Sequence, residues 1–244
     1  MRPNIFVLMA GDGQRFANVG YEVPKPLIVA KNKTILEHTL SSLPSIETFS
    51  LTFAIRQEHE VSHNVSSFLK QKYGTNINIK IFEKKTRGNL ETALETLKEF
   101  SVNGPILFLD ADNKYDGSNF ISFVEKLPAL AHAVICCFKP LDDSEKWCFA
   151  KINSLQEVEY ISEKKKIEDG LPMVGVFYYN DTKTFVDIGN KILSSNQTTK
   201  GEFYMSQTIQ KFLDEKYQVY GLVVENVVPL GTPEDLEKFV NNKI

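Results

Sequence analysis

The stretch from Asn4 to Pro26, NIFVLMAGDGQRFANVGYEVPKP, decides the fold. It begins with a short apolar run, Ile5 to Met9, which has the length and composition of a buried strand. A small turn with two glycines, residues 10–16, follows that run directly. Glycines leave the backbone N–H groups unobstructed, so a loop of this kind after a buried strand can close on phosphate oxygens.

Two cations in this stretch suit phosphate chemistry. Arg15 offers a rigid fork of donors, and Lys25 offers a movable point charge. The prolines on either side of Lys25 restrict its backbone and partly preset its reach. No Gly-Lys-Ser/Thr follows and the third glycine is missing, so neither a Walker A loop nor a dinucleotide fingerprint fits. On the glycines alone, an ordinary turn remains the alternative.

Outward from this stretch, strands and helices alternate through the first half of the chain. Apolar patterns predict strands at 51–55, 77–81 and 106–109, and the second of these alternates like a half-buried or edge strand. Helices are expected at 34–43, 61–73 and 90–100, and Thr34 and Glu37 have the spacing of a capping box. This order predicts a parallel sheet with helices on both faces.

The second half changes character. We expect strands at 133–138, 173–179 and 219–224, a hairpin of 149–152 with 158–161, and helices at 118–127, within 182–193, at 203–216 and at 233–240. The predicted fold is an α/β, Rossmann-like, doubly wound and mostly parallel sheet with an inserted, mostly antiparallel lobe. One domain, 1–244, is the economical interpretation, with a first half at 1–132, a second half at 133–232 and a closing helix at 233–244.

Polar groups follow two of the predicted strands, where ligands bind in open parallel sheets. Asp110 and Asp112 come directly after an apolar strand, and carboxylate oxygens are the ligands that Mg²⁺ prefers. Arg87 and Gly88 precede a helix whose N-terminus favours an anion or a polar base edge. Helix capping or a solvated loop is the alternative for the aspartates, and a simple turn is the alternative for Arg87 and Gly88.

The opening motif, Ala-Gly-x-Gly-x-Arg-Phe followed by Pro-Lys-Pro-Leu-Ile, resembles that of the sugar-1-phosphate nucleotidyltransferases. The closing Leu-Gly-Thr-Pro-Glu-Asp-Leu, 230–236, resembles the same family. The resemblance implies that Arg15 and Lys25 are catalytic and that Mg²⁺ is held by Asp112, with Asp110 as a second contact. The nucleotide-binding residues that it implies are Met9, Ala10, Gly11, Asp12, Gly13, Gln14, Arg87 and Gly88.

Three weaker matches in the second half imply an acceptor site. Glu163 and Lys164 resemble the family's Glu-Lys pair, Gly175 lies in a Gly-hydrophobic-Tyr strand, and Glu202 lies in a Gly-Glu-x-Tyr segment. A solvated charge run at 163–166 and an ordinary first-turn glutamate at 202 are the alternatives.

The sequence departs from the family at the position of the second metal ligand. Many members carry an aspartate two residues before the closing glycine, where this chain has Pro229. Asp112 would then work with Asp110, Glu225 or Asn226, or the triphosphate would hold more of the metal. The departure weakens the metal assignment.

Composition narrows the classes of protein to which this chain could belong. The 244 residues carry a net charge of −3, which argues against a nucleic-acid partner. No apolar run approaches the roughly 20 residues of a membrane span, and we expect no signal peptide. Three cysteines, an odd number, suit the cytoplasm. A homo-oligomer is among the states open to the chain. The histidines, which show no motif spacing, are expected to be structural or superficial: His38, His59, His63 and His132.

The expected partners are an NTP and a phosphorylated small molecule, and the expected products are an NDP-sugar and pyrophosphate. Surface-polysaccharide precursor synthesis is the family's usual setting. One alternative is a cytidylyltransferase that acts on a non-sugar phosphate such as choline phosphate. A glycosyltransferase with an Asp-x-Asp site and a non-catalytic nucleotide-binding protein are the others.

Overall fold

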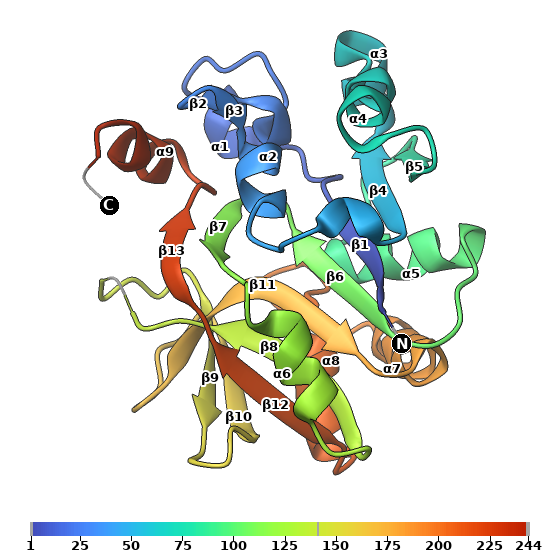
Figure 1. Ribbon diagram of the computed structural model, residues 1–244, viewed down its shortest axis with the longest axis vertical. Coiled ribbons are helices and arrows are strands. Elements are labelled where there is room, and N and C mark those ends of the chain that lie inside the picture. The colour runs from blue at the N-terminus through green and yellow to red at the C-terminus, as the bar shows by residue number, and fades with distance from the viewer. Residues whose placement is uncertain (1, 141, 243–244) are drawn as a thin grey trace.

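A central sheet organises the computed structural model of the protein, which describes residues 2–140 and 142–242 (Figure 1). Its strands are β1 (Asn4–Leu8), β4 (Leu51–Arg56), β5 (Asn78–Phe82), β6 (Ile106–Asp110), β8 (Ala131–Cys137), β9 (Cys148–Ile152), β10 (Val158–Glu163), β11 (Leu171–Tyr179) and β12 (Gln218–Val223). The order is β10-β9-β11-β6-β1-β4-β5, and β8 pairs with both β11 and β12. Strand β5 therefore lies at one edge, as its alternating sequence predicts.

Helices cover both faces of this sheet, so the fold is doubly wound. One face carries α2 (Ile35–Leu40), α4 (Val65–Tyr73) and α6 (Phe120–Lys126), and the other carries α5 (Asn89–Glu99), α7 (Thr182–Ser195) and α8 (Ser206–Asp214). Figure 1 shows α6 in front of the sheet and α8 partly hidden behind it. The remaining elements are α1 (Gln14–Ala17), α3 (Gln57–His63), α9 (Pro233–Val240), the 3-10 turns Lys25–Leu27 and Ile46–Thr48, and the small sheets β2 (Val29–Ala30) with β3 (Lys33–Thr34) and β7 (Asn113–Asp116) with β13 (Glu225–Pro229).

Strand β1 lies at the centre of the parallel part and feeds both hydrophobic cores. Ile5 and Val7 pack into the core on one face, whereas Phe6 and Leu8 pack into the core on the other. This alternation follows from the period of two in a strand, and a strand buried on both faces must be apolar throughout. The apolar run at the start of the chain is therefore explained by its central place in the sheet.

The register of the parallel strands positions the site. Strand β1 runs parallel to β4 and β6, and Leu8 lies opposite Ala54 on one side and Asp110 on the other. The loop that leaves β1 therefore begins beside Asp110, the last residue of β6, two residues before Asp112. The prediction of a parallel sheet is confirmed, and the loop after β1 and the end of β6 lie at the carboxyl ends of its strands.

The inserted lobe is antiparallel, as expected. Strand β11 runs antiparallel to β6, β8 and β9, and β9 with β10 forms the predicted hairpin. Strand β12 returns parallel to β8. Because β11 pairs with β6, the second half of the chain joins the same sheet next to the aspartates.

Two predicted helices differ from the structure. The helix expected at 61–73 is instead two helices, since Asn64 adopts a left-handed conformation (φ 47°) between α3 and α4, which asparagine tolerates. The helix expected to begin at Phe203 begins at Ser206. The Phe203 backbone is bonded elsewhere: its N–H donates to the Arg87 carbonyl (2.7 Å) and its carbonyl accepts from the Leu90 N–H (3.1 Å).

Other predictions made from the local sequence are confirmed. The capping box at Thr34 and Glu37 is present, and α9 spans 233–240 as predicted. Cys136 and Cys137 are buried on opposite faces of the sheet, and all three cysteines are free. Within 2–140 and 142–242, no helix is both long and apolar enough to cross a membrane.

Candidate active site

Two adjoining cavities open at the carboxyl end of the parallel strands. The first has a volume of about 400 Å³ and lies against the loop after β1, and the second has a volume of about 220 Å³ and lies against the antiparallel lobe. Residues that line both cavities are Arg15, Asn89, Asp110, Asp112, Tyr204 and Gly231. A bound molecule in either cavity would therefore meet Arg15 and the two aspartates.

The glycine loop forms one wall of the first cavity. All six predicted residues from Met9 to Gln14 line it. Gly13 adopts a left-handed conformation (φ 61°) just before α1, which a glycine reaches without steric cost. A Cβ placed on Gly11 would meet no atom within 4 Å, so the backbone there is open. This wall combines the open backbone at Gly11 with the side chains of Met9, Asp12 and Gln14.

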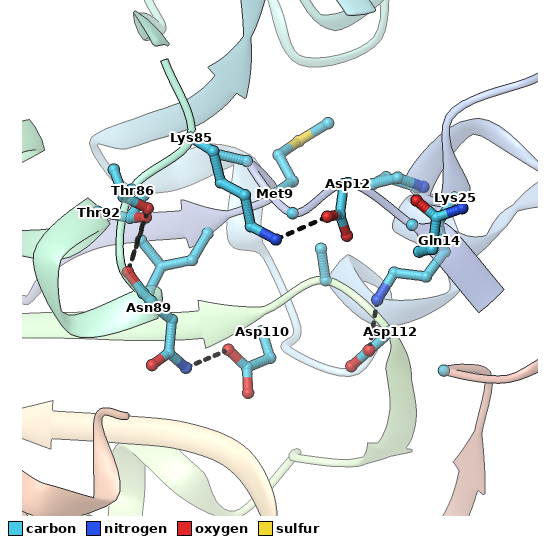
Figure 2. Close-up of a pocket in the computed structure, with 18 of the residues that line it drawn as sticks. Met9, Asp12, Gln14, Lys25, Lys85, Thr86, Asn89, Thr92, Asp110 and Asp112 are labelled. Atoms are coloured by element: carbon cyan, nitrogen blue, oxygen red, sulfur yellow. Dashed lines mark hydrogen bonds and ion pairs between the residues drawn. The ribbon is translucent and has the colours of Figure 1, made fainter. Parts of the chain in front are cut away.

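Lys25 and Asp112 meet where the two cavities join. Lys25 begins a 3-10 turn that contains Pro26, so the prolines shape its local backbone as predicted. Its Nζ donates to Oδ2 of Asp112 over 2.6 Å, and both side chains are about one-quarter exposed, at 25% and 23%. Figure 2 shows the lysine reaching across the cavity to the carboxylate. The structure thus brings together a predicted catalytic cation and a predicted metal ligand.

Asp110 lies beside Asp112 in a less solvated position. Burial, together with the neighbouring Asp112 charge, raises the pKa of Asp110 above its ordinary value. Asn89 donates to Oδ1 of Asp110 over 3.4 Å and also accepts from the Met205 N–H over 2.9 Å. Two neighbouring carboxylates of this kind are a fitting donor set for a divalent cation, because the cation would relieve their mutual repulsion.

The other suggested metal ligands do not reach this point. Glu225 lies opposite Asp116 in the pairing of β13 with β7, and neither Glu225 nor Asn226 lines the two cavities. Pro229 lines the second cavity but has no side-chain donor. In the part of the chain that the structure describes, no cluster of three or more histidine, cysteine or acidic side chains suits a metal. A metal here would rest on Asp110 and Asp112.

Gly88 and Arg87 require a different explanation from the one that the sequence suggests. A Cβ on Gly88 (φ 137°) would lie 2.3 Å from the Phe203 carbonyl oxygen, so close backbone packing demands the glycine. Gly88 also lines the first cavity. The Arg87 side chain does not line it: its guanidinium pairs with Glu91 (2.7 Å) and lies over the Phe203 ring. Arg87 therefore secures this turn, and only Gly88 faces the cavity.

The predicted acceptor residues separate between the cavities. Glu163, Lys164 and Gly175 line the second cavity, whereas Glu202 lines the first. Gly175 adopts φ 79°, and a Cβ there would lie 2.6 Å from Oδ2 of Asp110. The Asp110 carboxylate thus occupies the space that a side chain at position 175 would need.

Several lining residues escaped the sequence analysis. Lys85 reaches over the first cavity and pairs with Asp12 at 2.7 Å, and this ion pair lowers the pKa of Asp12 (Figure 2). Others are Thr86, Asn89, Thr92, Lys146, Trp147, Cys148, Tyr204, Ser206, Thr232 and Asp235. Thr86 and Asn89 could have been found from the sequence, because they flank Arg87 and Gly88 in the turn before α5. None of the four histidines lines either cavity.

A protein-family model matches nearly the whole chain. A family model described as nucleotidyl transferase matches residues 5–243. A comparison with curated proteins gave no match.

Three solved structures share the fold of this chain. The nucleoside-diphosphate-sugar pyrophosphorylase from Vibrio cholerae RC9 has 22% identity and a TM-score of 0.79, with 97% of this chain and 99% of that chain covered. The inositol-1-phosphate CTP transferase from T. maritima has 16% identity and a TM-score of 0.76, with 98% and 93% covered. A UDP-glucose pyrophosphorylase solved in complex with UDP-glucose also has 16% identity and a TM-score of 0.76, with 100% and 98% covered. At these identities the likeness shows the fold alone.

Proposed function

The chain belongs to the nucleotidyl transferase family, and on that premise we propose that it transfers an NMP from an NTP to a sugar 1-phosphate or a similar phosphorylated small molecule. The products are an NDP-sugar and pyrophosphate. The observation that carries this proposal is the meeting of Arg15, Asp110 and Asp112 at the junction of two cavities, with Lys25 paired to Asp112. An enzyme that joins two phosphate compounds needs two adjoining sites with cations where they meet.

The first cavity suits the NTP. Its glycine loop presents open backbone, and N–H groups in such a loop bind phosphate oxygens. Met9 to Gln14 and Gly88 would contact the nucleotide, while Arg87 would act only by holding the turn. The nucleotide-binding half of the chain is then 1–132, within a single domain of residues 1–244.

The second cavity suits the acceptor, bounded by residues of 133–232. Lys164 pairs with no carboxylate among the described residues, so its charge is available to a phosphate. Ser206 donates to Oε2 of Glu163 over 2.5 Å, which fixes that carboxylate at the cavity wall. Glu202 lies on the nucleotide side and would act near the junction.

The transfer itself needs positioning and charge neutralisation. An acceptor phosphate oxygen attacks the α-phosphorus in line, its new P–O bond forms, and the bond from the α-phosphorus to the bridging oxygen of the leaving pyrophosphate breaks. Arg15 would hold the leaving pyrophosphate, and Lys25 would draw the two anionic reactants together. A phosphate monoester is already ionised near neutral pH, so no general base is required.

Asp110 and Asp112 would hold Mg²⁺, because oxygen donors of two adjacent carboxylates fit this ion. When bound, the ion would neutralise charge on the phosphate oxygens. Lys25 engages Oδ2 of Asp112 over 2.6 Å, so Mg²⁺ would compete with the lysine for that oxygen.

We also propose a cytoplasmic setting and a role in supplying surface-polysaccharide precursors. All three cysteines are free and two are buried, as suits a reducing compartment.

The test is a pyrophosphate-release assay with Mg²⁺ that crosses four common NTPs with a panel of sugar 1-phosphates, inositol 1-phosphate and choline phosphate. Release that requires one NTP and one phosphorylated acceptor supports the proposal. Transfer from an NDP-sugar without pyrophosphate release would instead identify a glycosyltransferase. Tight NTP binding without turnover on any acceptor would identify a nucleotide-binding protein.

A further inference from the structure

We propose that Lys146, held by the buried carboxylate of Asp235, selects the acceptor by donating a hydrogen bond to a hydroxyl group on it. This inference rests on the proposed function, because it concerns the molecule that occupies the second cavity. Neither Lys146 nor Asp235 belongs to the phosphate-binding or metal-binding groups described above.

The first step is the fixed position of Lys146. Its Nζ donates to Oδ1 and Oδ2 of Asp235 over 2.9 and 2.8 Å. Asp235 lies in the first turn of α9, only 6% exposed, and also accepts from the Thr232 hydroxyl over 2.8 Å. Asp235 is thus anchored by its helix, and the flexible lysine is held at one place on the wall of the second cavity.

The second step is that Lys146 keeps one hydrogen-bond donor that Asp235 does not engage. A lysine ammonium group has three donors, and Asp235 engages two of them. The Lys146 side chain is 32% exposed and lines the second cavity, so a donor remains for a bound molecule. The carboxylate balances the lysine charge. A nearly neutral pair of this kind suits a hydroxyl group better than it suits a second phosphate.

The third step concerns the aromatic rings of the cavity. Quaternary ammonium groups are recognised by aromatic faces. Here the Lys146 ammonium lies 5.1 Å from the Trp147 ring centre, and the Lys164 ammonium lies 4.3 Å from the Tyr204 ring centre. One face of each ring is therefore already covered by a lysine ammonium group, so that face is not free to receive a choline head group.

The backbone supports this arrangement. Lys164 adopts a left-handed conformation (φ 53°), which is uncommon for lysine, and its N–H donates to the Trp147 carbonyl over 2.9 Å. The segment that carries Lys146 and Trp147 is thereby joined to the segment that carries Lys164. The phosphate end of an acceptor would meet Lys164, and its hydroxyl-bearing end would meet Lys146.

The experiment uses the full chain and three variants: Lys146→Met, the double variant Lys146→Met with Asp235→Asn, and the control Lys166→Met. The double variant removes the buried charge that the single variant leaves unpaired, so a folding defect in one does not end the test. Lys166 pairs with Asp143 at 2.6 Å and lines neither cavity, which makes it a matched lysine–aspartate control. Glucose 1-phosphate, inositol 1-phosphate and choline phosphate are the acceptors.

Acceptor binding is measured by calorimetry with a non-hydrolysable NTP analogue present, and turnover is measured by pyrophosphate release. We expect the wild type to prefer a hydroxyl-bearing phosphate over choline phosphate. Loss of a charged hydrogen bond should weaken binding of that acceptor by about 10-fold to 100-fold in the Lys146 variants, and choline phosphate should gain relative to it. Binding of the NTP analogue should stay within about 2-fold, since a loss of fold would weaken both ligands.

The outcomes separate the two proposals. Pyrophosphate release with acceptor binding unchanged in both Lys146 variants would overturn the role of Lys146 and leave the proposed function standing. Weakened acceptor binding in a chain that releases no pyrophosphate would support Lys146 and overturn the proposed function. A wild type that prefers choline phosphate, or binds none of the three acceptors, would also overturn the role of Lys146.

Discussion

The ammonium group of Lys25 lies 2.6 Å from Oδ2 of Asp112, across 87 residues of sequence. We assign Lys25 to the reacting phosphates and Asp112 to Mg²⁺. In the ligand-free chain they therefore neutralise each other. Substrate would compete with Asp112 for Lys25, and metal would compete with Lys25 for Asp112.

Removal of the Lys25 charge should slow the reaction without unfolding the chain. Lys25→Met is expected to lower kcat by about 10²-fold to 10³-fold, since a fixed donor at the reacting charge is lost. The control Lys33→Met removes an exposed lysine that lines neither cavity and should match the wild type. Steady-state kinetics with thermal denaturation provides the check. Wild-type turnover by Lys25→Met would refute the catalytic assignment.

Metal binding should respond in opposite directions to the two members of this pair. Lys25→Met frees Asp112, so Mn²⁺ binding in the absence of nucleotide should tighten roughly 5-fold, on the scale of a partly exposed ion pair. Asp112→Asn should weaken it. Electron paramagnetic resonance of free Mn²⁺ measures both, and Asp116→Asn, on an exposed part of β7, is the control. An unchanged affinity in Asp112→Asn would place the metal elsewhere.

Replacement of Gly88 should lower the stability of the fold, whatever it does to nucleotide binding. In Gly88→Ala the new Cβ would lie 2.3 Å from the Phe203 carbonyl oxygen, in addition to the strain of φ 137°. We expect a loss of about 3 kcal/mol or more in the free energy of unfolding.

Gly74→Ala isolates the backbone part of this effect, because Gly74 also has a positive φ (87°) but its added Cβ would meet no atom within 4 Å. Denaturant titration of both variants gives the comparison. Equal losses would show that the contact with Phe203 is not the cause.

The pair of Asp12 and Lys85 should affect the nucleotide and not the acceptor. Both side chains are exposed and both line the first cavity, so the ion pair should contribute less than about 1 kcal/mol to stability. Lys85→Met is expected to raise the KM for NTP several-fold and to leave the KM for the acceptor unchanged. Lys84→Met, its exposed neighbour outside both cavities, is the control. A change confined to the acceptor KM would contradict this placement.

Much of the fold could be predicted because its signals are local. The apolar run at 5–9 and the strand before Asp110 follow from burial on both faces of a sheet, and Thr34 with Glu37 follows from hydrogen bonding within one turn. The helix at 203–216 was misplaced at its start. Its Phe203 backbone is bonded to a turn more than 110 residues earlier, and no local pattern shows that.

The sequence by itself determined the order of the main-sheet strands and of most helices, the open glycine loop and the residue types available for phosphate and metal chemistry. Only the tertiary structure decided that Lys25 meets Asp112, that Lys146 meets Asp235, that Gly88 accommodates Phe203 and that Glu202 lies on the nucleotide side. The reason is physical. Periodicity and capping act within a few residues, whereas a cavity is formed by side chains from strands and loops that only the pairing of the sheet brings together.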